Sequence, residues 1–60
     1  MRVIKLKKGL WASTIHSDHD GGWYCEIFNS QGAGVGYTEV YPTEAEAVED
    51  AERIAEEVPA

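Results

Sequence analysis

The sequence predicts an α+β domain: an antiparallel meander of three strands, or four, followed by one C-terminal amphipathic helix packed on one face of the sheet. Residues 43–58 join a helix start signal to apolar side chains at helical spacing. Residues 10–41 alternate strand-forming runs with clusters of turn residues. The chain has 60 residues, a length that builds one small core, so we expect a single domain over residues 1–60.

The first part of the chain contains two runs of strand composition. Residues 2–8 mix β-branched and basic side chains, which is typical of a short edge strand whose lysines discourage pairing with another sheet. A glycine interrupts this run, and the pattern leaves open whether residues 2–8 form a separate strand. Residues 10–16 predict the next strand, with Trp11, Ser13 and Ile15 on one face.

The following strand, residues 23–29, has the clearest alternation. Its odd-numbered residues from Trp23 to Ile27 are expected to point toward the core, and Tyr24 and Phe28 away from it. One helix covers only one side of a sheet, so we expect these two aromatic rings on an uncovered face. Aromatic side chains on such a face indicate a contact site for another protein or a homodimer seam.

Two clusters of turn residues, 17–22 and 29–34, separate the later strands. Residues 35–41 predict the last strand, which Pro42 ends before the helix. The side chains expected to share one face of this strand are Val35, Tyr37, Glu39 and Tyr41.

The predicted helix begins at a capping box. The Thr43 hydroxyl can accept the backbone N–H of Glu46, and the Glu46 carboxylate can accept the backbone N–H of Thr43. We expect an i,i+4 ion pair between Glu49 and Arg53, and an end to the helix before Pro59. The apolar side chains at helical spacing, expected to pack on the sheet, are Ala47, Val48, Ala51, Ile54, Ala55 and Val58.

The net charge is concentrated on this helix. The formal net charge is −6; the charges of residues 1–42 cancel, whereas residues 43–58 carry seven carboxylates against Arg53. Such an acidic strip repels nucleic-acid phosphates, and it either serves solubility alone or binds a basic patch on another protein. The carboxylates that we select as partner-binding candidates are Glu49, Asp50, Glu52 and Glu56.

One turn has the composition of a metal site. His16, Asp18, His19 and Asp20 offer imidazole and carboxylate ligands that zinc or another divalent ion accepts. A polar hairpin turn has the same composition, and the segment lacks the terminal glutamate of an EF-hand loop. We predict no metal ligands here and keep metal binding as the alternative.

No pattern in the sequence predicts catalysis or a cofactor. Cys25 with a histidine would be a nucleophile and base, but its place between apolar strand residues is typical of core filling. The glycine-rich run at residues 32–36 joins strand to strand, whereas a phosphate-binding loop leads into a helix. We therefore predict that the protein is not an enzyme and has no catalytic or cofactor-binding residues.

The alternative function is nucleic-acid binding. The basic segment Arg2, Lys5, Lys7 and Lys8 could hold a phosphate backbone while aromatic rings stack on bases. A 60-residue core needs most of these rings, and the net charge disfavours a nucleic-acid partner. The aromatic residues in question are Trp11, Trp23, Tyr24, Phe28, Tyr37 and Tyr41.

Two short patterns resemble known families. The run Gly21-Gly22-Trp23-Tyr24, followed by Thr43-x-x-Glu46-Ala47-x-x-x-Ala51-x-Arg53-Ile54-Ala55, resembles very small bacterial and archaeal β-meander-plus-helix domains of unknown function. The run from Asp20 to Tyr24 and the Thr-x-x-Glu-Ala helix start are also similar to antitoxins of the HicB type, which neutralise a small RNA-cleaving toxin. Those antitoxins carry Pro-Asp-Leu-Pro-Gly-Cys where this chain has Asn-Ser-Gln-Gly-Ala-Gly at residues 29–34. Neither resemblance implies catalytic residues.

We therefore predict a small acidic, non-enzymatic protein-interaction module. The expected partner is another protein with a basic patch, such as a nucleic-acid-handling protein that the module inhibits, as an antitoxin does. A single cysteine and the lack of a long apolar run favour a cytoplasmic protein that does not enter a membrane.

Overall fold

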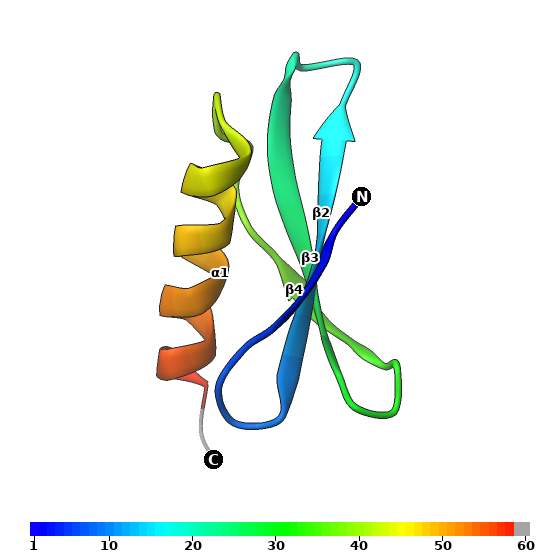
Figure 1. The fold of residues 1–60 in the computed structure, drawn as a ribbon, viewed down its shortest axis with the longest axis vertical. Coiled ribbons are helices and arrows are strands. Elements are labelled where there is room, and N and C mark those ends of the chain that lie inside the picture. The colour runs from blue at the N-terminus through cyan, green and yellow to red at the C-terminus, as the bar shows by residue number, and fades with distance from the viewer. Residues whose placement is uncertain (59–60) are drawn as a thin grey trace.

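The computed structural model describes residues 1–58 as two layers, a four-stranded antiparallel sheet and one helix along one of its faces (Figure 1). Strands adjacent in sequence are adjacent in the sheet, in the order β1-β2-β3-β4. The predicted α+β meander with a C-terminal helix is confirmed, and the meander has four strands. The elements are β1 (Val3–Lys5), β2 (Leu10–Ser17), β3 (Gly22–Asn29), β4 (Gly34–Tyr37) and α1 (Glu44–Glu57).

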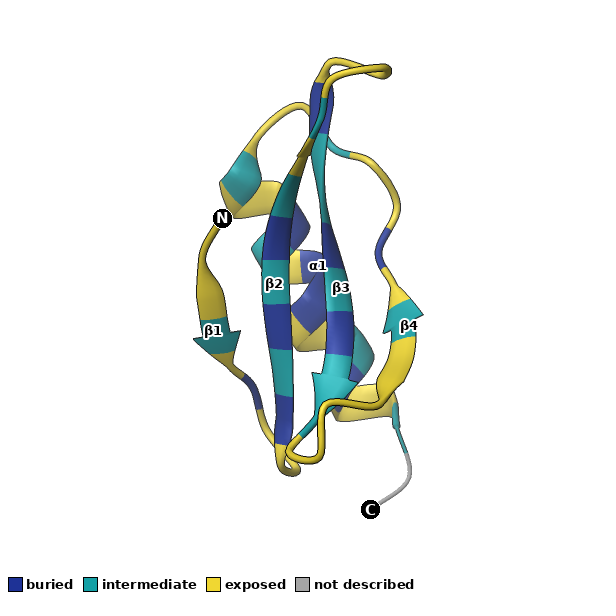
Figure 2. Cartoon of the chain, turned by 90° about the vertical axis from the view of Figure 1, so that its right-hand side faces the viewer, coloured by how far each residue is buried: buried dark blue, intermediate teal, exposed yellow. Residues whose placement is uncertain are grey.

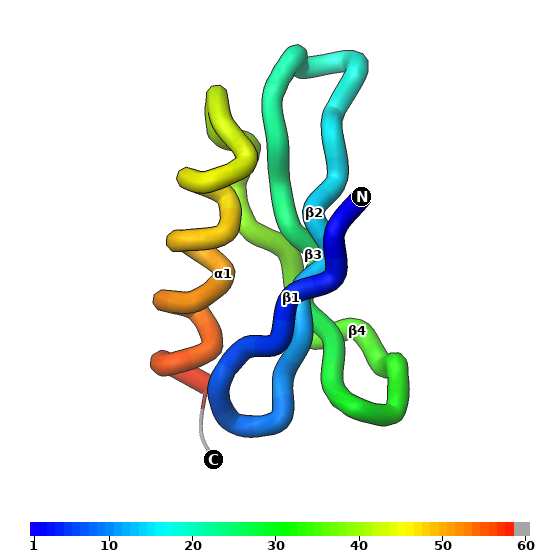
Figure 3. The backbone as a smooth tube through the Cα atoms, viewed as in Figure 1, coloured from blue at the N-terminus to red at the C-terminus, as the bar shows by residue number. Residues whose placement is uncertain are grey.

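The β2–β3 hairpin is the central part of the sheet. Each of its strands has eight residues, whereas β1 has three and β4 four, so the hairpin extends beyond both edge strands (Figure 3). Gly21 closes the hairpin turn with a φ of 70°, and its N–H donates to the Ser17 carbonyl over 2.8 Å. A glycine adopts this left-handed conformation without the steric cost that a side chain brings.

The two faces of the hairpin differ in burial where α1 covers it, at residues 10–15 of β2 and 24–28 of β3 (Figure 2). Ala12 lies opposite Ile27, and Thr14 lies opposite Cys25; all four are fully buried between the sheet and α1. Residues between them in the sequence are only partly buried, because they point to the side of the sheet that α1 does not cover. The predicted inward position of Cys25 and Ile27 is confirmed.

The N-terminal segment is a strand of its own, but shorter than residues 2–8. The chain leaves the sheet at Leu6, whose side chain is 7% exposed and joins the core. The backbone N–H of Leu6 donates to the Leu10 carbonyl over 2.8 Å. Lys8 and Gly9 close the loop with φ values of 60° and 71°. The loop then lies beside the C-terminal end of α1 (Figure 3).

The predicted last strand, residues 35–41, is wrong in length and in facing. β4 ends at Tyr37, and Tyr41 forms an isolated bridge with Trp23 through two hydrogen bonds of 2.7 Å. Tyr37 lies opposite Glu26 and points away from α1, whereas Tyr41 packs against the core. The two tyrosines therefore lie on opposite faces of the sheet.

The pairing with β3 has two irregularities, and the second of them, between Tyr37 and Tyr41, causes this difference. Between the pairs Ile27–Gly36 and Phe28–Gly34, β4 has one residue more than β3. A second extra residue lies between Thr38, which bonds to Cys25, and the bridge at Tyr41. Each such bulge reverses the facing of the residues that follow it. Strict alternation could not predict either of them.

The helix begins and packs as predicted. The Thr43 hydroxyl accepts the N–H of Glu46 over 3.2 Å and donates to the Glu46 carboxylate over 2.9 Å, whereas a full capping box would join that carboxylate to the Thr43 backbone. α1 ends at Glu57; Pro59, the predicted stop, lies outside the described residues. The helix residues at the centre of the core, all fully buried, are Ala47, Ala51 and Ala55.

Candidate interaction surfaces

The sheet face opposite α1 is uncovered in the described chain, residues 1–58 (Figure 2). The pairing of the strands places apolar side chains from every strand on it. We call this surface the open face. The apolar side chains of β2 and β3 on this face are partly buried by their neighbours. Those of the edge strands, Val3 and Tyr37, are 59% and 64% exposed. The apolar residues of the open face are Val3, Trp11, Ile15, Tyr24, Phe28 and Tyr37.

Cross-strand pairing arranges these rings. Trp11 lies directly opposite Phe28, and Ile15 directly opposite Tyr24. The Tyr24 and Tyr37 rings lie 6.2 Å apart at 52°, within the range of favourable aromatic contact. Trp11, Tyr24 and Phe28 are therefore partly buried by their neighbours in the sheet and keep a smaller part of their surface exposed.

The polar groups of the open face nearly balance in charge. Its centre holds Ser13, which pairs with Val3 on one side and with Glu26 on the other. Lys5 lies beside Trp11, with its Nζ 6.0 Å from the indole centroid, close enough for a cation–π contact. The strands therefore contribute one cation and one carboxylate to this face, which cancel, so the net charge of −6 lies elsewhere.

The alternation of β3 placed Tyr24 and Phe28 on the side away from the helix, where the structure has them. The sequence also placed Trp11 and Ile15 together but did not relate them to these rings. The register of the β2–β3 hairpin makes that connection, since it sets Trp11 against Phe28. The hairpin turn at residues 17–22 is the signal that could have given this register.

Three of the exposed carboxylates of α1 lie along one side of the helix. Glu49, Glu52 and Glu56 are exposed and follow each other at i, i+3 and i+7, so they line one side of the helix. Among residues 1–58, neither Glu49 nor Glu52 takes part in an ion pair. These three residues are the acidic strip.

Asp50, the fourth selected carboxylate, does not belong to this strip. It is 6% exposed, and its carboxylate accepts a hydrogen bond from the Arg53 guanidinium. Arg53 also lies 3.6 Å from the Glu57 carboxylate. The expected Glu49–Arg53 pair is therefore wrong, because Arg53 pairs with Asp50 and Glu57 instead. One arginine neutralises a buried carboxylate there, which lowers the cost of its burial.

The C-terminal end of α1 contacts the β1–β2 loop. The Lys7 Nζ donates to the Glu56 carboxylate over 2.8 Å, and the Lys8 Nζ donates to the backbone carbonyls of Glu56 and Val58 over 2.8 and 2.6 Å. The hydrogen bond between Lys7 and Glu56 lowers the pKa of Glu56 and raises that of Lys7. Two cations thus offset the negative end of the helix dipole.

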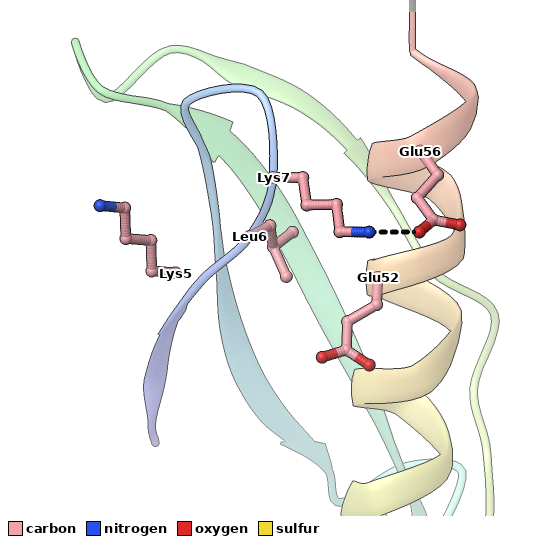
Figure 4. Close-up of a pocket in the computed structure, with 5 residues that line it drawn as sticks. All are labelled: Lys5, Leu6, Lys7, Glu52 and Glu56. Atoms are coloured by element: carbon pink, nitrogen blue, oxygen red, sulfur yellow. Dashed lines mark hydrogen bonds and ion pairs between the residues drawn. The ribbon is translucent and has the colours of Figure 1, made fainter.

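A shallow groove of about 500 Å³ lies beside this contact (Figure 4). Figure 4 shows the Lys7–Glu56 pair across the space between the β1–β2 segment and α1, with Leu6 and the carboxylate of Glu52 beside it. Of its charged groups, Lys7 and Glu56 bond to each other, while Lys5 and Glu52 take part in no ion pair within residues 1–58. The lining residues are Lys5, Leu6, Lys7, Glu52 and Glu56.

The histidine and aspartate turn is held by its own side chains. His16 Nδ1 lies 3.0 Å from an oxygen of Asp18, and the Ser17 hydroxyl lies 3.3 Å from an oxygen of Asp20. The His16 ring also meets the Trp23 ring edge-on, with centroids 5.0 Å apart. Within residues 1–58 the structure gathers no three histidine, cysteine or acidic side chains in a metal-binding arrangement.

Cys25 is part of the core, and the glycine-rich run at residues 32–36 belongs to a connection between two strands. The Cys25 thiol is fully buried, and this burial raises its pKa, so the nucleophilic thiolate is disfavoured. Residues 29–34 form the β3–β4 turn, in which the Asn29 side chain accepts the N–H groups of Gln31 and Ala33. This run leads from strand to strand and forms no helix N-terminus.

The fold and these surfaces define a class: a small α+β two-layer domain with one open sheet face and an acidic helix on the opposite side. Comparisons with models of known protein families, with curated proteins and with solved structures find no match for this chain. Among residues 1–58, α1 is too short and too polar to cross a bilayer.

Proposed function

We propose that the protein is a small, non-enzymatic interaction module with two contact surfaces, and that its acidic strip binds a basic patch on another protein. The observation that carries the proposal is the position of the two surfaces. The apolar open face lies on the side of the sheet away from α1, and the acidic strip lies on α1, which covers the opposite face of the sheet (Figure 1). A single flat interface cannot contain both surfaces.

Charge supports the choice of partner for the helix. The formal net charge of −6 resides in the helix segment, and Glu49 and Glu52 have no ion-pair partner within residues 1–58. A negative strip of this kind accelerates encounter with a positive patch and rejects negative surfaces. A basic nucleic-acid-handling protein of the cytoplasm, inhibited by the module, is the partner that we propose.

The alternative function, nucleic-acid binding, requires a basic segment beside the aromatic rings, and in this fold most of its basic residues lie elsewhere. Lys7 and Lys8 bond to the end of α1, and Arg2 pairs through its backbone with Thr14, on the side of the sheet that α1 covers. Lys5 is the basic residue of the segment that stays beside aromatic rings on the open face. A single cation gives little phosphate affinity, so we favour the protein partner.

A pull-down with a charge-matched control tests the helix proposal. We expect the wild-type chain to capture a basic protein from lysate of its native host, and Glu49→Lys/Glu52→Lys to lose it. Asp18→Lys/Asp20→Lys brings the same charge change, from −6 to −2, at the hairpin turn and should retain capture. Circular dichroism shows whether each variant is folded.

Capture of the same proteins by the helix variant would contradict the proposal. Titration of a labelled single-stranded DNA or RNA oligonucleotide tests the alternative directly. We expect no saturable binding at about 0.15 M salt, whereas binding that weakens steeply with added salt would favour nucleic acid.

A further inference from the structure

The open face presents its six apolar residues on the side of the sheet away from α1, a side that no other element of residues 1–58 covers (Figure 2). We propose that a second copy of this chain covers it, giving a symmetric dimer of four layers in the order helix, sheet, sheet, helix. This inference rests on the open face being a contact surface, as proposed above, and it adds the identity of the partner there.

The distribution of charge permits this contact and opposes the others between copies. The open face contributes Lys5 and Glu26, so two such faces meet without net repulsion, and the cation of each copy can approach the carboxylate of the other. The acidic helices then lie outside both sheets, about 30 Å apart if each layer is about 10 Å thick. That distance is several times the Debye length of about 8 Å, so their repulsion is screened. Contact through the helices would instead bring two acidic strips together.

The size of the face fits a weak dimer. The molecule measures 33 Å along the strands and 15 Å across them, the two dimensions seen in Figure 2. Two such faces would bury about 1,000 Å² in total, at the lower limit of specific interfaces. A reversible dimer with a dissociation constant in the micromolar range is therefore expected.

The edges of the sheet are poorer sites for a second copy. Lysine on an edge strand discourages pairing, and β1 carries Lys5 with Lys7 just beyond. β4 has four residues, contains one bulge and is followed by a second before Tyr41, and these bend the edge and interrupt a continuous ladder. Face-to-face packing needs neither edge.

Sedimentation velocity of the purified chain alone, from about 5 µM to about 1 mM, tests the dimer. We expect the wild type to shift from monomer to dimer across this range. Ser13→Arg places a long charged side chain at the centre of the open face and removes only a hydroxyl, and it should weaken association at least tenfold. Ala45→Arg, on the exposed side of α1, changes the net charge equally and should associate like the wild type.

A second substitution, on an edge strand, tests the dimer even if Ser13→Arg prevents folding, because Ser13 lies in the central strand β2. Tyr37 lies on an edge strand and is 64% exposed, so Tyr37→Lys should fold and should also weaken the dimer. A wild type that stays monomeric at about 1 mM would overturn the proposal, as would folded Ser13→Arg and Tyr37→Lys variants that dimerise normally. Since no other protein is present, these results are independent of the pull-down with the helix variants.

Discussion

The Thr38 hydroxyl accepts a hydrogen bond of 2.9 Å from the backbone N–H of Cys25, immediately after β4 ends. The Thr38 N–H in turn donates to the Cys25 carbonyl over 2.9 Å, and its hydroxyl donates to the Glu39 carbonyl over 2.8 Å. The Thr38 hydroxyl therefore accepts the Cys25 N–H in place of the backbone carbonyl that a regular strand would offer to β3. The chain can then take one extra residue before Tyr41 without leaving a buried N–H unpaired.

Thr38→Val tests this arrangement. Valine keeps the shape of threonine but leaves the buried Cys25 N–H without an acceptor, so we expect the free energy of unfolding to fall by about 1–3 kcal/mol. Thr38→Ser keeps the hydroxyl, so its free energy of unfolding should fall by less, about 0.8 kcal/mol for the loss of one methyl group. Urea denaturation of the three proteins gives the comparison. A valine variant as stable as the wild type would show that the hydroxyl is dispensable.

The three buried alanines of α1 allow the helix to approach the sheet closely. Ala51 is fully buried at the centre of this contact, so Ala51→Leu should overpack the core and lower the free energy of unfolding by about 1–3 kcal/mol. Ala45→Leu on the exposed side of the same helix should change it by less than about 0.5 kcal/mol. Thermal melts followed at 222 nm distinguish them. Equal effects at both positions would mean that α1 does not pack through Ala51.

Lys8 combines a favourable contact with an unfavourable backbone. Its ammonium group bonds two carbonyls at the end of α1, while its φ of 60° is costly for any residue with a side chain. Lys8→Ala loses the contact and keeps the strain, whereas Lys8→Gly loses the contact and relieves the strain. We therefore expect the glycine variant to be more stable than the alanine variant by about 1 kcal/mol. The opposite order in urea denaturation would contradict this account of the loop.

The Lys7–Glu56 pair predicts a pH dependence of stability. Its hydrogen bond lowers the pKa of Glu56, so the stabilisation is complete above the ordinary glutamate pKa of about 4.3 and is lost as the pH falls through the lowered value. Glu56→Gln should be less stable than the wild type at pH 6, and the difference should vanish near pH 2. Urea denaturation of both proteins at the two pH values, in low and in high salt, measures this difference in stability. A difference that persists at the acid end would exclude the ion pair as its cause.

The sequence predicted those parts of the fold that depend on local patterns. Thr43 and the apolar spacing fixed the helix, and alternation in residues 23–29 gave the correct facing of Tyr24 and Phe28. The facing of Tyr41 could not be predicted, because it depends on a bulge that a side-chain hydrogen bond stabilises. Bulges of this kind add a residue without changing composition.

The candidate surfaces were predictable only in part. The acidic character of α1 follows from composition, but a carboxylate is polar at every helix position, so nothing marked Asp50 as buried. The contact of Lys7 and Lys8 with the end of α1 joins residues about fifty positions apart. Such pairing depends on the complete fold, and it removes two of the lysines that the nucleic-acid alternative required.

The claim that the open face is the contact surface is tested most directly by amide NMR spectra of the ¹⁵N-labelled chain recorded at increasing protein concentration. We expect shifts that grow with concentration and cluster on Trp11, Ser13, Tyr24 and their neighbours on the open face, while the exposed side of α1 stays unchanged. Spectra that do not change up to about 1 mM, or shifts centred on α1, would contradict the proposed surface.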